Sequence, residues 1–243
     1  MYTNCIFDLY GTLVDIRTDE NKAVVWEKLS MFYGYYGAAY TPSQLKAAYE
    51  KLVKEALPEA AAGNGAAHEA FPELKLENVF QALFENKGIC ADLRLAVCAG
   101  QFFRILSTEY IRLYEGTEKM LKSLKAAGKK LYLLSNAQRI FTEYEMKALN
   151  IYPLFDEIFI SSDFGFKKPD SRFFEALLRQ CGLSPEASIM IGNDGICDIA
   201  GAKAAGLHSL YIHSNLSPKE DRPMADMVLE KVDMEAVTEI LLG

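Results

Sequence analysis

The spacing of apolar residues divides the chain into three regions. Residues 5–7 form a short apolar run that ends at Asp8 and is followed by Gly11, which predicts a buried strand leading into a sharp turn. Between residues 18 and 110, apolar positions recur at helical spacing. From residue 111 onward, short apolar runs alternate with amphipathic segments, which predicts alternating strands and helices.

The third region has the pattern of a parallel sheet with helices on both faces. The predicted strands cover residues 130–134, 157–160, 188–191 and 208–212, with 227–229 as an edge strand, and the predicted helices cover 117–127, 140–149, 171–181, 200–205 and 234–242. We expect the strand at residues 5–7 to join the same sheet. The α/β domain then consists of residues 1–16 and 111–243, and residues 17–110 are an insertion.

The insertion is predicted to be helical and to contain no strand. Helix-start signals precede amphipathic segments at residues 18–34, 41–57, 72–86 and 91–110. Residues 60–67 are small and indicate a connector. Their glycines follow no strand, so a phosphate-binding loop is not expected there.

Composition narrows the class of protein. Half of the 243 residues are hydrophobic and 24% are charged, as in a folded globular chain. A formal net charge of -7 without a Lys/Arg cluster argues against a nucleic-acid partner, and no apolar stretch has membrane-spanning length. The five widely spaced cysteines predict free thiols in a reducing compartment. We therefore expect a cytoplasmic protein that acts on a small molecule; its oligomeric state is left open.

Polar residues stand where three of the predicted strands end. They are Asp8, the pair Ser135-Asn136 and the pair Asn193-Asp194, with Asp198 one helical turn further on and Lys168 in a loop after a strand. Each has an ordinary role when taken alone, as a turn residue, a helix cap or an exposed lysine. The carboxyl ends of parallel strands meet at one edge of a sheet, where α/β proteins bind ligands. Their joint placement therefore favours a functional site.

Four short motifs in this order resemble those of the haloacid dehalogenase-like (HAD) hydrolase superfamily. They are Phe7-Asp8-Leu9-Tyr10-Gly11-Thr12-Leu13, Leu134-Ser135-Asn136, Lys168-Pro169-Asp170, and Ile191-Gly192-Asn193-Asp194 followed by Asp198-Ile199. The resemblance covers essentially the whole chain. It implies an α/β fold, with a Rossmann-like doubly wound parallel-sheet core and an inserted all-helical cap of the kind that the family calls C1.

The resemblance also implies a role for each motif residue. The implied catalytic residues are Asp8, Tyr10, Ser135, Asn136 and Lys168, the implied Mg2+ ligands are Asp8, Asp194 and the backbone carbonyl of Tyr10, and Thr12, Asn193 and Asp198 are expected around them. Asp8 would be the nucleophile, since a carboxylate that attacks phosphorus or carbon forms a covalent ester. Lys168 and the metal would supply the positive charge that a phosphate dianion needs, and Ser135 would hydrogen-bond the transferred group.

Tyr10 departs from the pattern of the family's phosphatases, which carry a second aspartate there as general acid and base. A phenol with a pKa of about 10 is a poor base at neutral pH. Tyrosine at this position resembles the 2-haloacid dehalogenases of the superfamily, whose halide leaving group needs no proton. Those dehalogenases resemble one another in lacking a metal site and in using an arginine after the first motif. This chain has Asp194 and no arginine between Arg17 and Arg94.

Three functions remain at this stage. The favoured one is a magnesium-dependent, phosphatase-like hydrolase for a small phosphorylated metabolite, with a preference for good leaving groups such as acyl or aryl phosphates. The alternatives are a 2-haloacid dehalogenase-like carbon–halogen hydrolase and a catalytically weak protein that binds a phosphorylated ligand. No motif in the insertion names the substrate.

Overall fold

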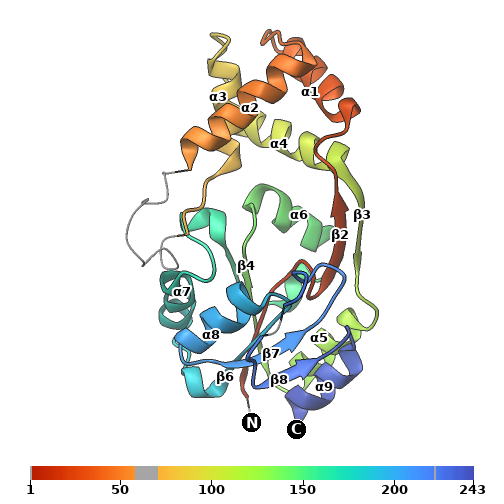
Figure 1. The fold of residues 1–243 in the computed structure, drawn as a ribbon, viewed down its shortest axis with the longest axis vertical. Coiled ribbons are helices and arrows are strands. Elements are labelled where there is room, and N and C mark those ends of the chain that lie inside the picture. Colours follow the sequence, from red (N-terminus) through yellow and green to blue (C-terminus); the bar gives the residue numbers. More distant parts are fainter. Residues whose placement is uncertain (1, 58–70, 222) are drawn as a thin grey trace.

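A parallel sheet forms the centre of the α/β core (Figure 1). The computed structural model describes residues 2–57, 71–221 and 223–243, and within them a six-stranded sheet has the order β5-β4-β1-β6-β7-β8. Its strands are β1 (Asn4–Phe7), β4 (Lys130–Ser135), β5 (Glu157–Ile160), β6 (Ser188–Gly192), β7 (His208–Ile212) and β8 (Met227–Leu229). All neighbouring strands are parallel. The predicted strands, including the edge strand, are confirmed.

The two faces of the sheet are buried under different helices. The helices of the core are α5 (Thr117–Ala126), α6 (Arg139–Ala148), α7 (Ser171–Cys181), α8 (Gly201–Ala204) and α9 (Met234–Leu242). Along β1, Cys5 and Phe7 pack in the cluster that includes α5 and α9, whereas Ile6 packs in the cluster that includes α7 and α8. Side chains alternate between the faces of a strand. Because both faces are apolar here, the strand is a continuous hydrophobic run.

The cap lies over the carboxyl-end edge of this sheet, in the upper part of Figure 1. In the part of the chain that the structure describes, it consists of α1 (Ala23–Tyr35), α2 (Pro42–Ala56), α3 (Leu76–Glu85) and α4 (Leu93–Ser107). Trp26, Tyr33, Phe80 and Phe103 are buried in a cluster that also includes Ile140 and Phe141 of α6. Among the described residues, the helices are too short or too polar to cross a membrane.

The strand pair β2 (Val14–Thr18) and β3 (Thr108–Leu113) joins the cap to the core and corrects the expectation from sequence. The predicted helix up to residue 110 was wrong, and so was the absence of strands between residues 17 and 110. The helix α4 ends at Ser107, and Tyr110 pairs with Arg17 in an antiparallel ribbon. Threonine, tyrosine and isoleucine in β3 are good strand formers. Their partner strand is distant in sequence, so local spacing does not reveal the pairing.

The start of α3 is a second correction. The helix begins at Leu76 and not at residue 72, because Pro72 forms an isolated antiparallel bridge with Phe166. The N–H of Glu73 also donates to the Gly165 carbonyl at 3.0 Å. This pairing with the core holds the segment out of the helix. The predicted connector at residues 60–67 lies outside the described residues.

Asp15 fixes the ribbon to the core. Its side chain is 4% exposed and accepts hydrogen bonds from Arg112 (2.7 Å, Nη2), Tyr110 (3.2 Å) and Asn215 (2.9 Å). Burial alone would raise the pKa of Asp15, but these hydrogen bonds outweigh burial and hold the pKa below its ordinary value. The charged form of Asp15 therefore stabilises the position of the ribbon.

We predict that Asp15→Asn lowers the free energy of unfolding at pH 7 by about 1 kcal/mol, a small value because Arg112 is largely exposed and the pair is screened by solvent. A depressed pKa contributes stability above the ordinary pKa of about 3.9, and this contribution is lost as the pH falls through the folded-state value. The difference in the free energy of unfolding between parent and variant, measured by urea unfolding, should thus become smaller from pH 7 to pH 3. An equal difference at both pH values would contradict the assignment.

Candidate active site

Asp8 follows β1, the strand that lies between β4 and β6 in the sheet. Its N–H donates to the Ile191 carbonyl at 2.9 Å, which continues the strand pairing by one residue. The turn that follows depends on Gly11, whose φ is +88°. A Cβ on Gly11 would lie 2.3 Å from Nδ2 of Asn193. The glycine therefore allows both the turn and the close approach of the loop after β6 to the loop that carries Asp8.

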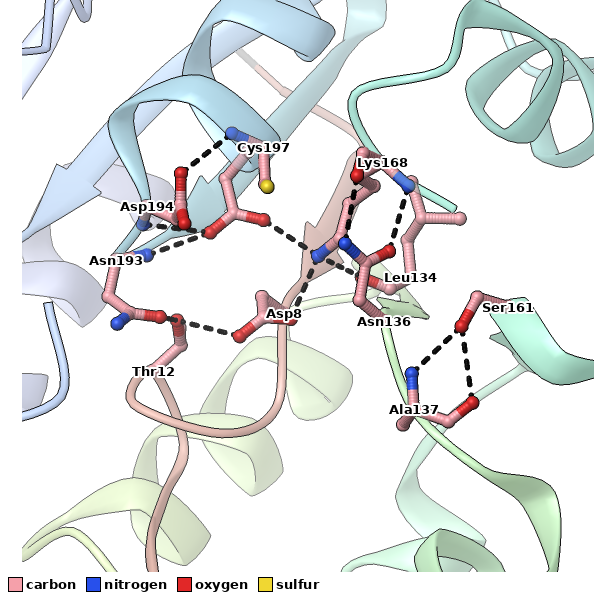
Figure 2. A network of polar contacts seen from close by, with 11 residues as sticks. Asp8, Thr12, Leu134, Asn136, Ala137, Ser161, Lys168, Asn193, Asp194 and Cys197 are labelled. Carbon is pink, nitrogen blue, oxygen red and sulfur yellow. Dashed lines mark hydrogen bonds and ion pairs between the residues drawn. The ribbon is translucent and has the colours of Figure 1, made fainter. Parts of the chain in front are cut away.

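Lys168 is the centre of the charge network in Figure 2. Its ammonium group is 2.8 Å from Oδ1 of Asp8, 2.6 Å from Oδ1 of Asp198 and 2.7 Å from the Leu134 carbonyl oxygen. The residue is 1% exposed. Burial opposes the charge, but Asp198 and Asp8 outweigh burial and raise the pKa of Lys168 above its ordinary value. The lysine is therefore a permanently charged group beside Asp8.

Asn136, which follows β4, holds the backbone of Lys168 in place. The Asn136 side chain accepts from the N–H of Lys168 at 2.8 Å and donates to the Lys168 carbonyl at 2.9 Å. The neighbouring Ser135 is 1% exposed, and within the described chain its hydroxyl oxygen is buried with no hydrogen-bond partner. An unpartnered buried hydroxyl costs about 1–3 kcal/mol. Such unpartnered groups are uncommon in folded proteins.

Asp198 connects the lysine to the loop after β6. Its Oδ2 accepts from the N–H groups of Asn193 and Asp194, both at 3.0 Å, while Oδ1 accepts from Lys168. Burial has the largest effect on Asp198 and raises its pKa above the ordinary value; Lys168 lowers this pKa and Asp8 raises it. Each oxygen of this carboxylate is thus committed to a neighbour, and Asp198 serves to place Lys168 and the loop.

Asn193 and Asp194 point in different directions in Figure 2. The hydroxyl of Thr12 is 3.2 Å from Oδ1 of Asn193 and 3.4 Å from Oδ2 of Asp8, so it lies between these two side chains. The Asp194 carboxylate instead accepts from the backbone N–H groups of Ile196 (2.9 Å) and Cys197 (2.7 Å) and caps the helical turn Gly195–Ala200. The asparagine is therefore the side chain of this loop that lies beside Thr12 and Asp8.

The side chain of Tyr10 lies against α6 and α4. Its hydroxyl hydrogen-bonds the carboxylate of Glu145 and lies 3.0 Å from Oγ1 of Thr142, both on α6. Burial, and after it the nearby Glu145 carboxylate, raises the pKa of Tyr10 well above its ordinary value. The phenol is therefore neutral, and its proton is committed to this cluster.

Arg104 and Glu145 complete the cluster around Tyr10 and were missed by sequence reasoning. The Nε of Arg104 on α4 lies 2.6 Å from Oε1 of Glu145. The two residues come from helices that only the tertiary structure brings together. The available signal was a single charged residue, Arg104, within the apolar run Phe102-Phe103-Arg104-Ile105-Leu106.

Comparisons with known proteins agree with this arrangement. The model of the haloacid dehalogenase-like hydrolase family matches residues 2–206. A glyceraldehyde 3-phosphate phosphatase of Methanothermobacter thermautotrophicus is 37% identical over 110 residues, which are 45% of this chain and 49% of that protein. The match thus spans about half the length of this relative.

Two solved structures share the fold over nearly the whole length of both chains. The 2-haloacid dehalogenase of Pseudomonas syringae pv. Tomato DC3000 has a TM-score of 0.63 at 19% identity, with 99% of this chain and 98% of that chain covered. The putative HAD-hydrolase YfnB of Bacillus subtilis, bound to magnesium, has a TM-score of 0.55 at 20% identity, with the same coverage. The predicted fold class, a parallel-sheet core with a helical cap, is confirmed. The chain, with its four motifs gathered at one edge of the sheet, belongs to the haloacid dehalogenase-like hydrolases.

Proposed function

We propose that this hydrolase is a magnesium-dependent phosphatase that acts on a small phosphorylated metabolite through Asp8. The observation that carries the proposal is a buried, charged lysine in contact with one carboxylate at the sheet edge, together with an unpartnered serine hydroxyl at the end of the neighbouring strand β4. Its phosphatase-named relative supports the same reaction class.

We also propose that the α/β domain comprises residues 1–16 and 111–243 and the cap residues 17–110, with the division within β2 and β3.

Asp8 is arranged to act as a nucleophile. Its Oδ1 accepts a strong hydrogen bond from Lys168 at 2.8 Å, whereas among the described residues Oδ2 has only the long 3.4 Å contact with Thr12. One carboxylate oxygen is therefore held, and the other is less committed. Attack of Asp8 on a phosphoryl group would form an aspartyl-phosphate ester, which water then hydrolyses. Lys168 offsets the negative charge that gathers as the phosphate approaches Asp8.

Ser135 and Asn136 complete the phosphate position in this proposal. The buried hydroxyl of Ser135 would donate to a phosphoryl oxygen and so gain the partner that it lacks. Asn136 acts through Lys168, because its two hydrogen bonds fix the backbone of that residue. A hydrogen bond to a charged oxygen is worth about 1.5–3 kcal/mol. The Ser135 hydroxyl would therefore stabilise the phosphoryl group most when its oxygens carry the most negative charge.

Magnesium fits the oxygen donors at this edge. The carboxylate of Asp8, the backbone carbonyl of Tyr10 and the loop Asn193-Asp194 offer hard oxygen ligands, which suit Mg2+. In the chain as described, no three His, Cys, Asp or Glu side chains gather into a metal-binding group. We propose Asp8, the Tyr10 carbonyl and Asp194 as ligands; the helix-capping Asp194 carboxylate must then turn, and otherwise Asn193 takes its place. The ion would neutralise the phosphate charge.

Tyr10 bears on the choice of substrate. Its hydroxyl is committed to Glu145, and its raised pKa keeps it protonated, so it provides no base beside Asp8. The site therefore suits leaving groups that need little protonation, which are acyl and aryl phosphates. The same observation favours a carbon–halogen hydrolase as second candidate, since halide leaves without a proton. Arg104, a partly buried cap arginine, is paired with Glu145 and does not stand free for a haloacid carboxylate.

We predict that Asp8→Asn lowers the rate of hydrolysis at least about a hundredfold, because an amide is a poor nucleophile. The rates of aryl, acyl and alkyl phosphates and of 2-chloropropionate should be measured with and without Mg2+ in parent and variant. Magnesium-dependent turnover of aryl or acyl phosphates in the parent alone supports the phosphatase. Turnover of 2-chloropropionate alone favours the dehalogenase, and no turnover in the parent favours a protein that only binds its ligand.

We predict opposite effects of Ser135→Ala on stability and activity. The variant removes a buried hydroxyl that has no partner, so the melting temperature should stay equal to that of the parent or rise slightly. Phosphatase activity should fall about 10–100-fold through the lost hydrogen bond to a charged group. A clear fall in melting temperature would mean that the hydroxyl has a structural role.

The ligand assignment predicts that Asp194→Ala weakens magnesium binding at least about tenfold, since one of two carboxylates is lost. Isothermal titration of the apoprotein measures the affinity, and Asn193→Ala is the matched comparison. If Asp194→Ala binds like the parent while Asn193→Ala does not, the asparagine is the ligand and Asp194 serves only as a helix cap.

A further inference from the structure

The cap packs directly on α6, the helix that follows the Ser135-Asn136 loop. Ile140 and Phe141 of α6 are buried in the apolar cluster of the cap. On the cap side, a Cβ added to Gly100 of α4 would lie 2.7 Å from Cδ1 of Ile140, so the two helices are in close contact. The side chain of Gln101 donates to the Ile140 carbonyl at 3.2 Å. The β2–β3 ribbon is therefore not the only connection between cap and core.

A partly buried ion pair lies within this α4–α6 interface. Arg104 of the cap meets Glu145 of the core at 2.6 Å, and their side chains are 18% and 13% exposed. The guanidinium group also lies 5.3 Å from the centre of the Phe141 ring and 5.7 Å from that of Tyr10. Burial lowers the pKa of Arg104, but the contacts with Glu145 outweigh burial, so the arginine is charged.

Glu145 also reaches the loop of the nucleophile. Its Oε2 accepts the hydrogen bond of the Tyr10 hydroxyl, and Tyr10 is two residues from Asp8. The backbone of Tyr10 forms a bridge with Val14, the first residue of β2. The Glu145 carboxylate thus contacts Arg104 of the cap through both oxygens, at 2.6 Å and 3.4 Å, and the loop of Asp8 through Oε2.

We propose that Arg104 and Glu145 form a latch that holds the cap closed, and that Glu145 orders the Asp8 loop through Tyr10 when the latch is shut. Both are positioning residues. Asp8 is 7% and Lys168 1% exposed, and the cap lies over the edge of the sheet that carries them. The apolar contacts of Ile140 and Phe141 favour the closed state, and the ion pair sets the orientation of the cap on α6. Water can solvate both charges again on opening, which keeps the latch reversible.

Hydrogen exchange of the full-length protein tests the latch without a substrate. In Glu145→Gln, amide exchange in residues 93–113 should become at least about tenfold faster, because the partly buried Arg104 loses its counter-charge. Exchange in the core strands β1, β4 and β6 should stay as in the parent. The matched control is Glu143→Gln on the same helix, whose partners are Lys147, 49% exposed, and Arg139, 28% exposed at 3.8 Å. This control should exchange like the parent.

The double variant Arg104→Met/Glu145→Gln guards against a folding defect, since it leaves neither charge buried alone. It should keep the core protected and retain fast exchange in residues 93–113. Tyr10→Phe keeps the ion pair but removes the hydroxyl. It should raise exchange in residues 9–14 and leave residues 93–107 unchanged.

Kinetics with p-nitrophenyl phosphate and Mg2+ add a second readout that rests on the proposed function. Glu145→Gln should lower kcat at least about tenfold, with a smaller change in KM, because the latch orders the loop of the nucleophile.

The latch would be overturned if the amides of residues 93–113 exchanged at the same rate in Glu145→Gln and in Glu143→Gln. Faster exchange throughout the core would also overturn it, since the pair would then be merely structural. Unchanged exchange of residues 9–14 in Tyr10→Phe would overturn the link to Asp8. If the parent lacks phosphatase activity, the proposed function fails, and the exchange results still decide the latch.

Discussion

The buried charge of Lys168 is the constraint on which the site depends. An ammonium group removed from water is costly unless oxygen atoms surround it. Here the oxygens come from Asp8, Asp198 and the carbonyl of Leu134, which belong to three separate segments of the chain. The ends of β1 and β4 and the loop after β6 must therefore converge on one point. The lysine that would assist the chemistry is also the group that assembles the site.

Most of the surrounding polar groups are hydrogen-bonded and hold the site together, whereas one of them has no partner. Asn136 fixes the backbone of Lys168, and Asp198 holds both the lysine and the N–H groups of Asn193 and Asp194. Ser135, by contrast, is buried without a partner in the described structure. Folded proteins satisfy nearly all buried polar groups, and the exceptions gather at functional sites. The contrast between the satisfied Asn136 and the unsatisfied Ser135 is consistent with a ligand position beside Asp8.

The helix α6 gives the cap and the site a common support. Its first turn follows the Ser135-Asn136 loop, its residues Ile140 and Phe141 pack in the cap, and Glu145 meets both Arg104 and Tyr10. The side chain of Tyr10 consequently belongs to the cap–core interface. The same placement accounts for the absence of an acid or base at this position, because the phenol proton is committed to Glu145.

The sequence by itself determined the strands of the six-stranded sheet, their order along the chain and the residues at their ends. The runs at residues 5–7 and 188–191 are buried on both faces, so hydrophobicity alone identifies them, and polar residues at their ends must share the carboxyl edge of a parallel sheet. Only the tertiary structure decided the pairing of β2 with β3 and the meeting of Arg104 with Glu145. Local spacing sets the face on which a residue lies. The direction of a polar side chain is set by partners from distant segments, which local spacing does not contain.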